Sequence, residues 1–354
     1  MVLLLPWKPW ATDESLEPPT ITSPTIKDGL TILIPARNEE ATIKEVVTAA
    51  KGQGKDIYII VVDDCSNDNT ADIAQEALGD SGHVVSGTPP PSGWSGKLWA
   101  LEQGLWHVKT PMVLLLDADI LLKEGIVATA REFMEKNQLD FLSLMAELRM
   151  TNAWERLFMP AFVYFFKLLY PFALSNRHGH FIAAAAGGFI LTKTKVLKHV
   201  GAFEAIRQAL IDDCALASRV KRAGFRTWIG LTRSVVSLRR YQGLGKIWHM
   251  VERTAFTQLR HSWLLLFLTT IVMSVMFIWP VAGILSSNWK MVVPCLAALS
   301  FMCITYLPTL RYYNQPAILA PTLPLVATLY MAMTWSSAMR FATGKGACWK
   351  ERKY

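Results

Sequence analysis

Acidic residues recur directly after short apolar runs in the first third of the chain. Asp63-Asp64 follows the run Ile57–Val62, and Asp117-Ala118-Asp119 follows the run Met112–Leu116. Carboxylates gathered in this way repel one another unless a cation or hydrogen-bond donors compensate. A hard divalent cation such as Mg²⁺ takes one or two carboxylates and leaves positions for phosphate oxygens. The pattern therefore predicts a diphosphate that is bound through Mg²⁺ or Mn²⁺.

Strands and helices alternate over residues 29–150 and would position these side chains. We interpret the apolar runs as buried parallel strands and expect helices between them. The expected strands are Leu30–Ile34, Ile57–Val62 and Met112–Leu116, and the expected helices are 39–51, 69–78, 97–108 and 124–136. This order predicts βαβ units in an α/β fold with a doubly wound, mostly parallel sheet. Ligands of such sheets bind beyond the carboxyl ends of the strands, where the acidic residues fall.

Two common dinucleotide and triphosphate motifs are absent from the sequence. No G-x-x-x-x-G-K-[ST] occurs, so the phosphates are not held by a P-loop. No G-x-G-x-x-G follows the first apolar run, which disfavours a Rossmann dehydrogenase. The diphosphate would then depend on the acidic and basic side chains at the strand ends.

Four segments resemble the family-2 glycosyltransferases of the GT-A fold in order and approximate spacing over residues 30–230. They are Ile34-Pro35-Ala36-Arg37-Asn38-Glu39, Val62-Asp63-Asp64 with Ser66, Asp68 and Thr70, Asp117-Ala118-Asp119, and Ile211-Asp212-Asp213-Cys214-Ala215-Leu216 with Arg219, Gly224 and Phe225. Within that family, Gly93–Ala100, Ile211–Leu216 and Met250–Phe256 are similar to the hopene-associated glycosyltransferase subgroup. Members of that subgroup also have a C-terminal membrane region.

The resemblance implies a nucleotide-sugar donor, most often a UDP-sugar. It implies that Asp63 and Asp64 contact the base and ribose, with Asp64 as the first choice. It further implies that Asp117 lies near the ribose or the metal and that Asp119 coordinates the metal. The remaining donor-site candidates are Pro35, Arg37, Glu39 and Lys97, of which the two cations would face the nucleotide or diphosphate.

The family pattern makes Asp213 the catalytic base. Asp212 would share that role or raise the pKa of the pair. Glycosyl transfer needs an acceptor hydroxyl that loses its proton as it attacks the anomeric carbon, and one positioned carboxylate can take that proton. In-line attack would invert the anomeric centre. Gly187-Gly188 would allow a close approach of the backbone near the acceptor.

The composition points to a membrane protein. Apolar residues make up 52% of the chain and charged residues only 18%, with a formal net charge of +8, whereas soluble domains carry roughly 25% charged residues. Three stretches lack any charge, namely Trp263–Leu285, Met291–Leu310 and Pro316–Met339. Because about 20 apolar residues cross a bilayer, we expect two to three spans within residues 263–340. A lipid acceptor is then expected, and a nucleic-acid partner is not.

We divide the chain in linear order. Residues 1–28 are interpreted as an N-terminal arm, either the remnant of a membrane anchor or a segment that lies at the membrane interface. Residues 29–240 are interpreted as the GT-A domain, 241–262 as an amphipathic membrane-surface helix, 263–340 as the spans and 341–354 as a basic tail. Within the domain, segment 157–174 is either an interfacial helix or a buried core helix, and the sequence leaves both open. Arg253 and Arg260 place the catalytic domain on the cytoplasmic side of a bacterial plasma (inner) membrane as a multi-pass protein. The basic tail also favours the cytoplasm, which three full spans would not allow.

The sequence thus predicts a metal-dependent, inverting glycosyltransferase that moves one sugar to a membrane lipid hydroxyl, in hopanoid biosynthesis if the subgroup name holds. The Q-x-x-R-W signature of processive polysaccharide synthases is absent, which disfavours polymer synthesis. Two alternatives stay open. One is transfer to a polyprenyl phosphate, an acceptor that is already an anion. The other is a non-catalytic, nucleotide-sugar-binding membrane protein.

Overall fold

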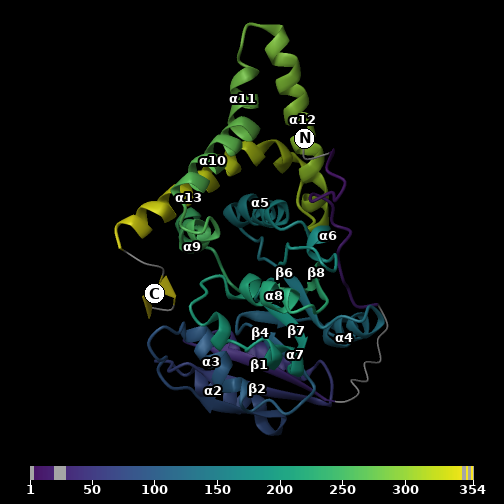
Figure 1. The fold of residues 1–354 in the computed structure, drawn as a ribbon, viewed down its shortest axis with the longest axis vertical. Helices are drawn as coiled ribbons and strands as arrows, with labels where there is room; N and C mark the ends of the chain where they lie inside the picture. The colour runs from purple at the N-terminus through teal and green to yellow at the C-terminus, as the bar shows by residue number, and fades with distance from the viewer. Residues whose placement is uncertain (1–3, 20–28, 345–347, 350–351, 354) are drawn as a thin grey trace. The chain divides into compact units, whose positions relative to one another are not determined.

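A computed structural model describes residues 4–19, 29–344, 348–349 and 352–353, and the chain divides into two compact units (Figure 1). The sheet unit consists of Glu14–Leu148 and Phe172–Arg239, and the helical unit of Met1–Asp13, Arg149–Pro171 and Arg240–Tyr354. This division differs from the linear one, because residues 149–171 group with the C-terminal helices and not with the predicted 29–240 domain. Parts of the predicted arm 1–28 and tail 341–354 lie outside the described residues.

An eight-stranded sheet in the order β3-β2-β1-β4-β7-β6-β8-β5 forms the centre of the sheet unit. Its strands are β1 Leu30–Ala36, β2 Ile57–Asp63, β3 Gly82–Ser86, β4 Met112–Leu116, β5 Ile120–Leu122, β6 Phe141–Glu147, β7 Phe189–Lys193 and β8 Thr227–Ser237. The three predicted strands are therefore confirmed. Strands β3, β2, β1 and β4 run parallel, whereas β7 lies antiparallel to both β4 and β6. The sheet is mixed, and its parallel half carries the predicted acidic loops.

Helices cover both faces of this sheet. They are α1 Ile43–Lys51, α2 Thr70–Leu78, α3 Gly96–Leu105, α4 Ile126–Lys136, α6 Phe172–Ser175, α7 Thr194–His199 and α8 Asp212–Arg222, with the short turns η2 Gly79–Ser81 and η3 Glu204–Ile206. Consecutive residues of β1 pack into different cores: Ile32 joins the cluster that contains α1 and α4, and Leu33 joins the cluster that contains α3 and α8. This alternation follows from the period of two in a strand, and burial on both faces explains the nearly continuous apolar runs.

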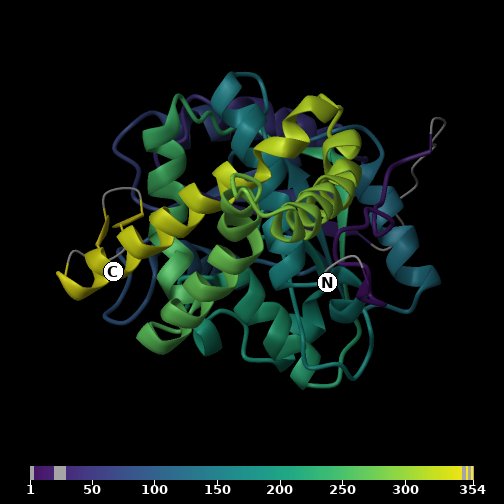
Figure 2. The same ribbon diagram turned by 90° about the horizontal axis from the view of Figure 1, so that it is seen from above.

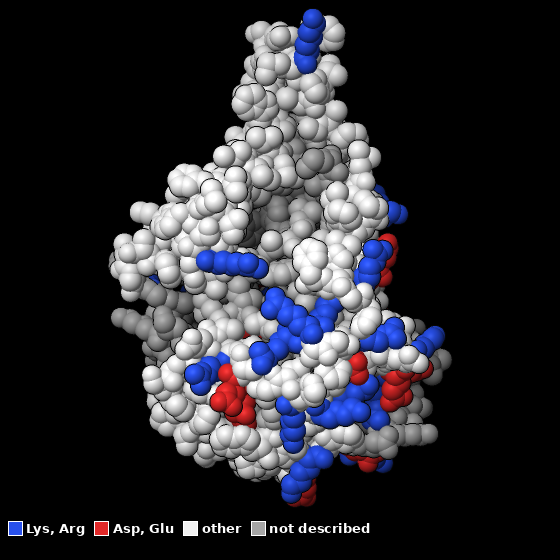
Figure 3. Space-filling model, viewed as in Figure 1, with Lys and Arg blue, Asp and Glu red and all other residues white. Residues whose placement is uncertain are grey.

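The helical unit contains the predicted membrane segments. Its elements are α5 Ala153–Leu169, α9 Leu244–Gln258, α10 Trp263–Met273, the π-helical turn η4 Ser274–Ile278, α11 Trp279–Gly283, α12 Trp289–Tyr312, η5 Ala317–Thr322, α13 Leu323–Ala342, β9 Cys348–Trp349 and β10 Arg352–Lys353. Among the described residues, three helical segments are long and apolar enough to cross a membrane, namely Trp263–Gly283, Trp289–Tyr312 and Ala317–Ala342. They coincide closely with the three uncharged stretches of the sequence. In Figure 3 the surface over the α11–α12 hairpin is almost entirely white, as a lipid-facing surface requires.

Segment 157–174 is split between two helices. Helix α5 begins earlier than predicted, because Asn152 and Glu155 form a capping box. Within the helical unit, the Tyr164 hydroxyl lies 3.0 Å from the Thr305 hydroxyl on α12, and the Tyr330 hydroxyl of α13 donates to the Phe158 carbonyl at 2.8 Å. These contacts favour the buried-helix interpretation of α5 over the interfacial one.

The predicted surface helix forms as α9 and packs on α13 (Figures 1 and 2). The Phe256 amide donates to the Ser337 hydroxyl at 3.1 Å. Glu252 pairs with Arg340 at 3.4 Å. Its position at a membrane surface stays a prediction.

Candidate active site

The parallel register of the sheet brings the predicted loops to one edge. Strand β1 pairs with β2 so that Ala36 lies opposite Asp63, and β1 pairs with β4 on its other side. The residues that follow all three strands therefore emerge together. Helices α3 and α8 contribute Lys97 and the Asp212-Asp213 pair from their first turns.

These elements enclose a pocket whose polar wall is made by Lys97, Asp117, Gly187, Asp212 and Asp213. Pro35, at the end of β1, lines the same pocket, and its remaining wall is apolar and includes Leu98, Leu115, Phe203 and Leu216. Sequence-predicted residues from four separate segments thus meet in one place.

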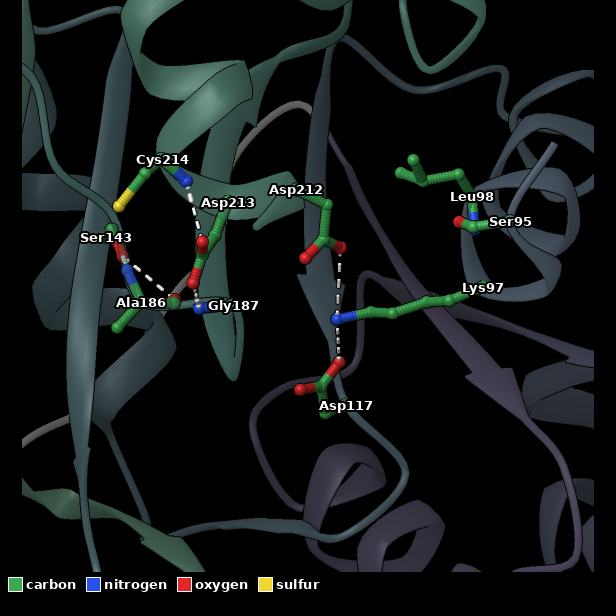
Figure 4. Close-up of polar contacts among 10 residues, drawn as sticks. All are labelled: Ser95, Lys97, Leu98, Asp117, Ser143, Ala186, Gly187, Asp212, Asp213 and Cys214. Atoms are coloured by element: carbon green, nitrogen blue, oxygen red, sulfur yellow. Dashed lines mark hydrogen bonds and ion pairs between the residues drawn. The ribbon is translucent and has the colours of Figure 1, made fainter. Parts of the chain in front are cut away.

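Lys97 is the cation at the centre of this pocket (Figure 4). Its Nζ lies 2.8 Å from Asp117 Oδ1 and 3.4 Å from Asp212 Oδ2. Burial alone would lower the pKa of Lys97, but the carboxylates of Asp117, Asp212 and Asp213 outweigh burial and raise the pKa. The ammonium group therefore stays charged and offsets part of the negative charge around it.

Asp213 is held by two backbone amides. Its Oδ2 accepts a hydrogen bond from the Gly187 N–H at 2.9 Å, and its Oδ1 accepts one from the Cys214 N–H at 2.7 Å. Burial, and then the neighbouring Asp212 carboxylate, raise the pKa of Asp213 to about 7, against the opposing effect of Lys97 and the two amides. A general base works best when its pKa lies near the operating pH, so a carboxyl with this pKa could accept a proton near neutral pH.

Asp117 and Asp119 are the predicted metal ligands. Burial raises the pKa of Asp117, Lys97 opposes that shift, and the nearby Asp119 carboxylate adds to it. Among the described residues, no group of three or more His, Cys, Asp or Glu side chains gathers as a cation site. One or two carboxylates are enough for Mg²⁺ when substrate phosphates complete the shell. The two aspartates therefore fit a metal that binds together with a diphosphate, and the metal stays a prediction.

The two residues of the Asp63-Asp64 pair differ in burial, and their contact with the nucleotide stays a prediction. Asp64, the first choice for the nucleotide, is only 1% exposed. The Asp63 carboxylate accepts a hydrogen bond from the Ser66 amide through Oδ2 at 3.2 Å, whereas its buried Oδ1 has no hydrogen-bond partner among the described residues. A buried oxygen without a partner is a group that a ligand donor would satisfy. Of the pair, Asp63 is the better placed to meet a nucleotide.

Arg37 and Glu39 tie the loops together. The Arg37 guanidinium donates through Nη1 to the Asp64 and Cys65 carbonyls at 2.5 and 2.8 Å, and Arg37 is 9% exposed. The Glu39 amide donates to the Thr70 hydroxyl at 2.8 Å. Neither residue lines the pocket described above, so their predicted contact with the nucleotide receives no direct geometric support.

The structure also adds residues to the site. The Gly187-Gly188 pair had indicated a close backbone approach, and Gly187 does approach Asp213 through its amide. Two further residues lie next to these contacts: the Ser143 hydroxyl accepts the Ala186 N–H, and the Cys214 N–H donates to Asp213 (Figure 4). Only the presence of a serine within the apolar strand segment Phe141–Glu147 hinted at Ser143.

Comparison with known proteins finds a family match over part of the chain. Residues 31–201, just under half of the chain, match the family described as glycosyl transferase family 2. A 4,4'-diaponeurosporenoate glycosyltransferase of Staphylococcus haemolyticus is 33% identical over 94 residues, which are 27% of this chain and 25% of that protein. The corresponding Staphylococcus aureus (strain USA300) protein is 32% identical over 118 residues, 33% of this chain and 31% of that protein. The chain thus matches only a quarter to a third of the length of these relatives.

A solved structure shares the fold over most of the chain. A mannosyltransferase from Pyrobaculum calidifontis, solved in complex with GDP-Man and Mn²⁺, superposes with a TM-score of 0.58 at 17% identity, covering 96% of this chain and 93% of that one. At this identity the likeness concerns the fold alone. Asp212 and Asp213 lie beyond the range of the family match. The chain therefore has the GT-A fold, and its residues 31–201 match glycosyl transferase family 2.

Proposed function

We propose that the chain is a membrane-bound glycosyltransferase that moves one sugar from a nucleotide-sugar to a hydroxyl group of a membrane lipid. The observation that carries this proposal is the Asp213 carboxyl. It has a pKa of about 7 and lies in the same pocket as the Lys97–Asp117 ion pair. A protein that only bound the donor would gain nothing from such a base. The three apolar helices supply the reason for a lipid acceptor.

In the proposed reaction, Asp213 takes the proton of the acceptor hydroxyl while the acceptor oxygen attacks the anomeric carbon. The bond from the anomeric carbon to the diphosphate oxygen breaks, and the nucleoside diphosphate leaves. In-line attack inverts the anomeric centre, and base assistance of this kind contributes about 10²- to 10⁴-fold. Asp212 keeps the Asp213 pKa high through its like charge.

The donor diphosphate would lie beside Lys97, the cation of the pocket. A Mg²⁺ or Mn²⁺ ion held by Asp119 and Asp117 would neutralise charge that develops on the leaving diphosphate. The unpaired Oδ1 of Asp63 would accept a hydrogen bond from the nucleoside. We propose a UDP-sugar as the donor on the basis of the family resemblance. Because the structural relative was solved with GDP-Man, a GDP-sugar is the first alternative donor to test beside the UDP-sugars.

The acceptor is proposed to be an isoprenoid lipid. The subgroup resemblance indicates a hopanoid, whereas the curated relatives are named for diaponeurosporenoate, a carboxylate. We propose a hydroxyl acceptor because an acceptor that is already an anion needs no base. The enzyme would lie in a bacterial plasma membrane, with Arg253 and Arg260 holding the catalytic unit on the cytoplasmic side.

The test is nucleotide release by purified protein in detergent. Wild type, Asp119→Ala and Asp213→Asn are compared on a panel of UDP-sugars and GDP-Man, with Mn²⁺ or Mg²⁺ and a hopanoid-containing lipid extract. Asp72→Asn, an exposed carboxylate of α2, is the matched control and should behave as wild type. Release that needs both metal and lipid and is lost in the first two variants supports the proposal.

Two other outcomes would indicate a different function. Release that survives Asp213→Asn but not Asp119→Ala indicates an anionic acceptor, such as a polyprenyl phosphate or a lipid carboxylate. Donor binding without release from any nucleotide-sugar indicates a non-catalytic binding protein.

A further inference from the structure

The loop that supplies the Gly187 amide leaves the sheet just beside the candidate base. Strands β6 and β7 pair in antiparallel register as far as Ser143 opposite Ile190, and β7 begins at Phe189. The preceding residues, Ala183–Gly188, run as a loop without strand pairing. This loop must be held by other contacts if its amide is to stay on Asp213.

Ser143 makes the contact nearest to that amide. Its hydroxyl accepts a hydrogen bond from the Ala186 N–H at 2.8 Å and donates one to the Ala186 carbonyl at 3.0 Å. One hydroxyl has a single donor and two acceptor lone pairs, so both bonds can form together. Ser143 is fully buried. Where the backbone pairing between β6 and β7 ends, the Ser143 side chain therefore bonds both backbone polar groups of Ala186.

Three consecutive residues then reach three parts of the site. Ala186 binds Ser143, Gly187 donates its N–H to Asp213, and the Gly188 carbonyl accepts the Asp117 amide at 3.4 Å. A Cβ on Gly187 would lie 3.4 Å from both Asp213 Oδ2 and Lys97 Nζ. The glycine thus borders the gap between base and lysine, where the reacting groups would meet. A shift of this loop would move the base relative to that gap.

The loop has one further anchor on the helix of the base. The Cys214 thiol donates to the Ala185 carbonyl at 3.4 Å. It holds the Ala185 carbonyl, which is not part of the peptide that precedes Gly187. The Ala186 carbonyl also accepts the Phe189 N–H at 3.4 Å within the turn. Among the described residues, Ser143 is the side chain that bonds the Ala186 carbonyl of the peptide preceding Gly187 (Figure 4).

We propose that Ser143 is a positioning residue of the transfer reaction, which through Ala186 holds the Gly187 N–H on Asp213 and so fixes the base against the acceptor. The inference rests on the proposed function, because it assumes that Asp213 is the base. Ser143 itself is buried behind the loop and touches neither donor nor acceptor in this assignment.

The first test is a double-mutant cycle on sugar transfer. Ser143→Ala should lower kcat about tenfold with donor KM unchanged, because small displacements of a catalytic group cost up to about 10²-fold. In the Asp213→Asn background, Ser143→Ala should cause no further loss, because its effect passes through the removed carboxylate. An equal loss in both backgrounds would mean that Ser143 acts only on general stability, and it would overturn the proposal.

The matched control is Thr192→Val. Thr192 is equally buried, lies on the neighbouring strand β7 and donates its hydroxyl to the Asp140 carbonyl at 2.9 Å. It has no described contact with the Ala183–Gly188 loop. This variant loses a buried hydroxyl as Ser143→Ala does, but its kcat should stay at the wild-type value. A loss as large as that of Ser143→Ala would again contradict a specific role.

A second measurement separates this inference from the proposed function. Hydrogen–deuterium exchange of the peptide that spans residues 183–190 is followed in the donor-free protein. Exchange should be faster in Ser143→Ala and unchanged in Thr192→Val. Unchanged exchange in Ser143→Ala overturns the positioning role whether or not the protein transfers sugar. Faster exchange in Ser143→Ala, together with no sugar transfer by the wild type, would confirm the loop contact but contradict the proposed function and, with it, the catalytic purpose of Ser143.

Discussion

The triplet Asp-Asp-Cys occurs twice in the sheet unit, and its two copies have opposite surroundings. Asp63-Asp64-Cys65 closes strand β2, whereas Asp212-Asp213-Cys214 opens helix α8. In both copies the cysteine thiol donates to a backbone carbonyl at 3.4 Å. The second aspartate is nearly inaccessible in the first copy and lines the pocket in the second.

The backbone explains this difference. At the end of β2, the Asp64 amide donates to the Ala36 carbonyl of β1 at 2.8 Å, so the residue continues the sheet and its side chain is covered. In the first turn of α8, amides have no intrahelical partner, and the Cys214 amide turns to Asp213 instead. The same three residue types thus give a structural aspartate in one place and a candidate base in the other. Four predictions follow from this contrast.

The largest expected effect on activity comes from substitutions in the two aspartate pairs themselves. Asp213→Asn should lower kcat by about 10²- to 10⁴-fold, because it removes the proton acceptor. Asp63→Asn should instead raise donor KM about tenfold with little change in kcat, because a charged hydrogen-bond partner of the nucleoside is lost. Steady-state kinetics with varied donor concentration distinguish the two. Equal effects on kcat would remove the contrast between the copies.

The next effect concerns Lys97, the cation that pairs with the Asp212 carboxylate of the second copy. Lys97→Met should reduce kcat/KM by about 10²-fold, because the diphosphate and three carboxylates lose their counter-charge. Lys193→Met is the control, since Lys193 forms a comparable ion pair with Asp140 at 2.7 Å elsewhere in the sheet unit. Its kcat/KM should match wild type. A small effect of Lys97→Met would show that the metal alone compensates the acidic cluster.

The pH dependence of kcat/KM should report the ionisation of Asp213 in the second copy. Asp213 must be ionised to act as a base, so kcat/KM should rise with pH through a midpoint near the Asp213 pKa of about 7. Asp212→Asn removes the like charge that raises this pKa and should move the midpoint about one pH unit lower. A pH–rate profile from pH 5 to 9 measures both. If the midpoint is the same in Asp212→Asn as in wild type, the rise of kcat/KM with pH belongs to a group other than Asp213.

The smallest effect is on stability. The folded-state pKa of Asp213 is raised from 3.8 to about 7, so its favourable contribution is fully present below pH 4 and is lost as the pH rises to 7. The asparagine of Asp213→Asn cannot ionise. The gain in Tm of this variant over wild type should therefore be larger at pH 8 than at pH 4, by roughly 2 to 4 °C. Thermal unfolding in detergent at the two pH values measures the difference. Asp64→Asn should show no such pH-dependent gain.

Much of the fold could be predicted because its signals are local. Strands β1, β2 and β4 are apolar runs buried on both faces, and the three membrane-length helices are uninterrupted apolar segments. The antiparallel insertion of β7 between β4 and β6 could not be predicted, because pairing partners distant in sequence leave no periodic signal. The grouping of α5 with α12 and α13 was missed for the same reason.

The sequence by itself determined which residue types follow each strand, and a parallel sheet then brings them to one edge. Asp117 was identified in this way, whereas Lys97 and Asp213 were identified through the resemblance to the family-2 glycosyltransferases. Only the tertiary structure decided that the Asp212-Asp213 pair lines the pocket while Asp64 is buried, and which amides hold Asp213. Burial and neighbouring charges set the pKa of a carboxyl, and the contact between Ser143 and Ala186 joins residues 43 positions apart. Such properties depend on distances across the fold, which no local pattern records.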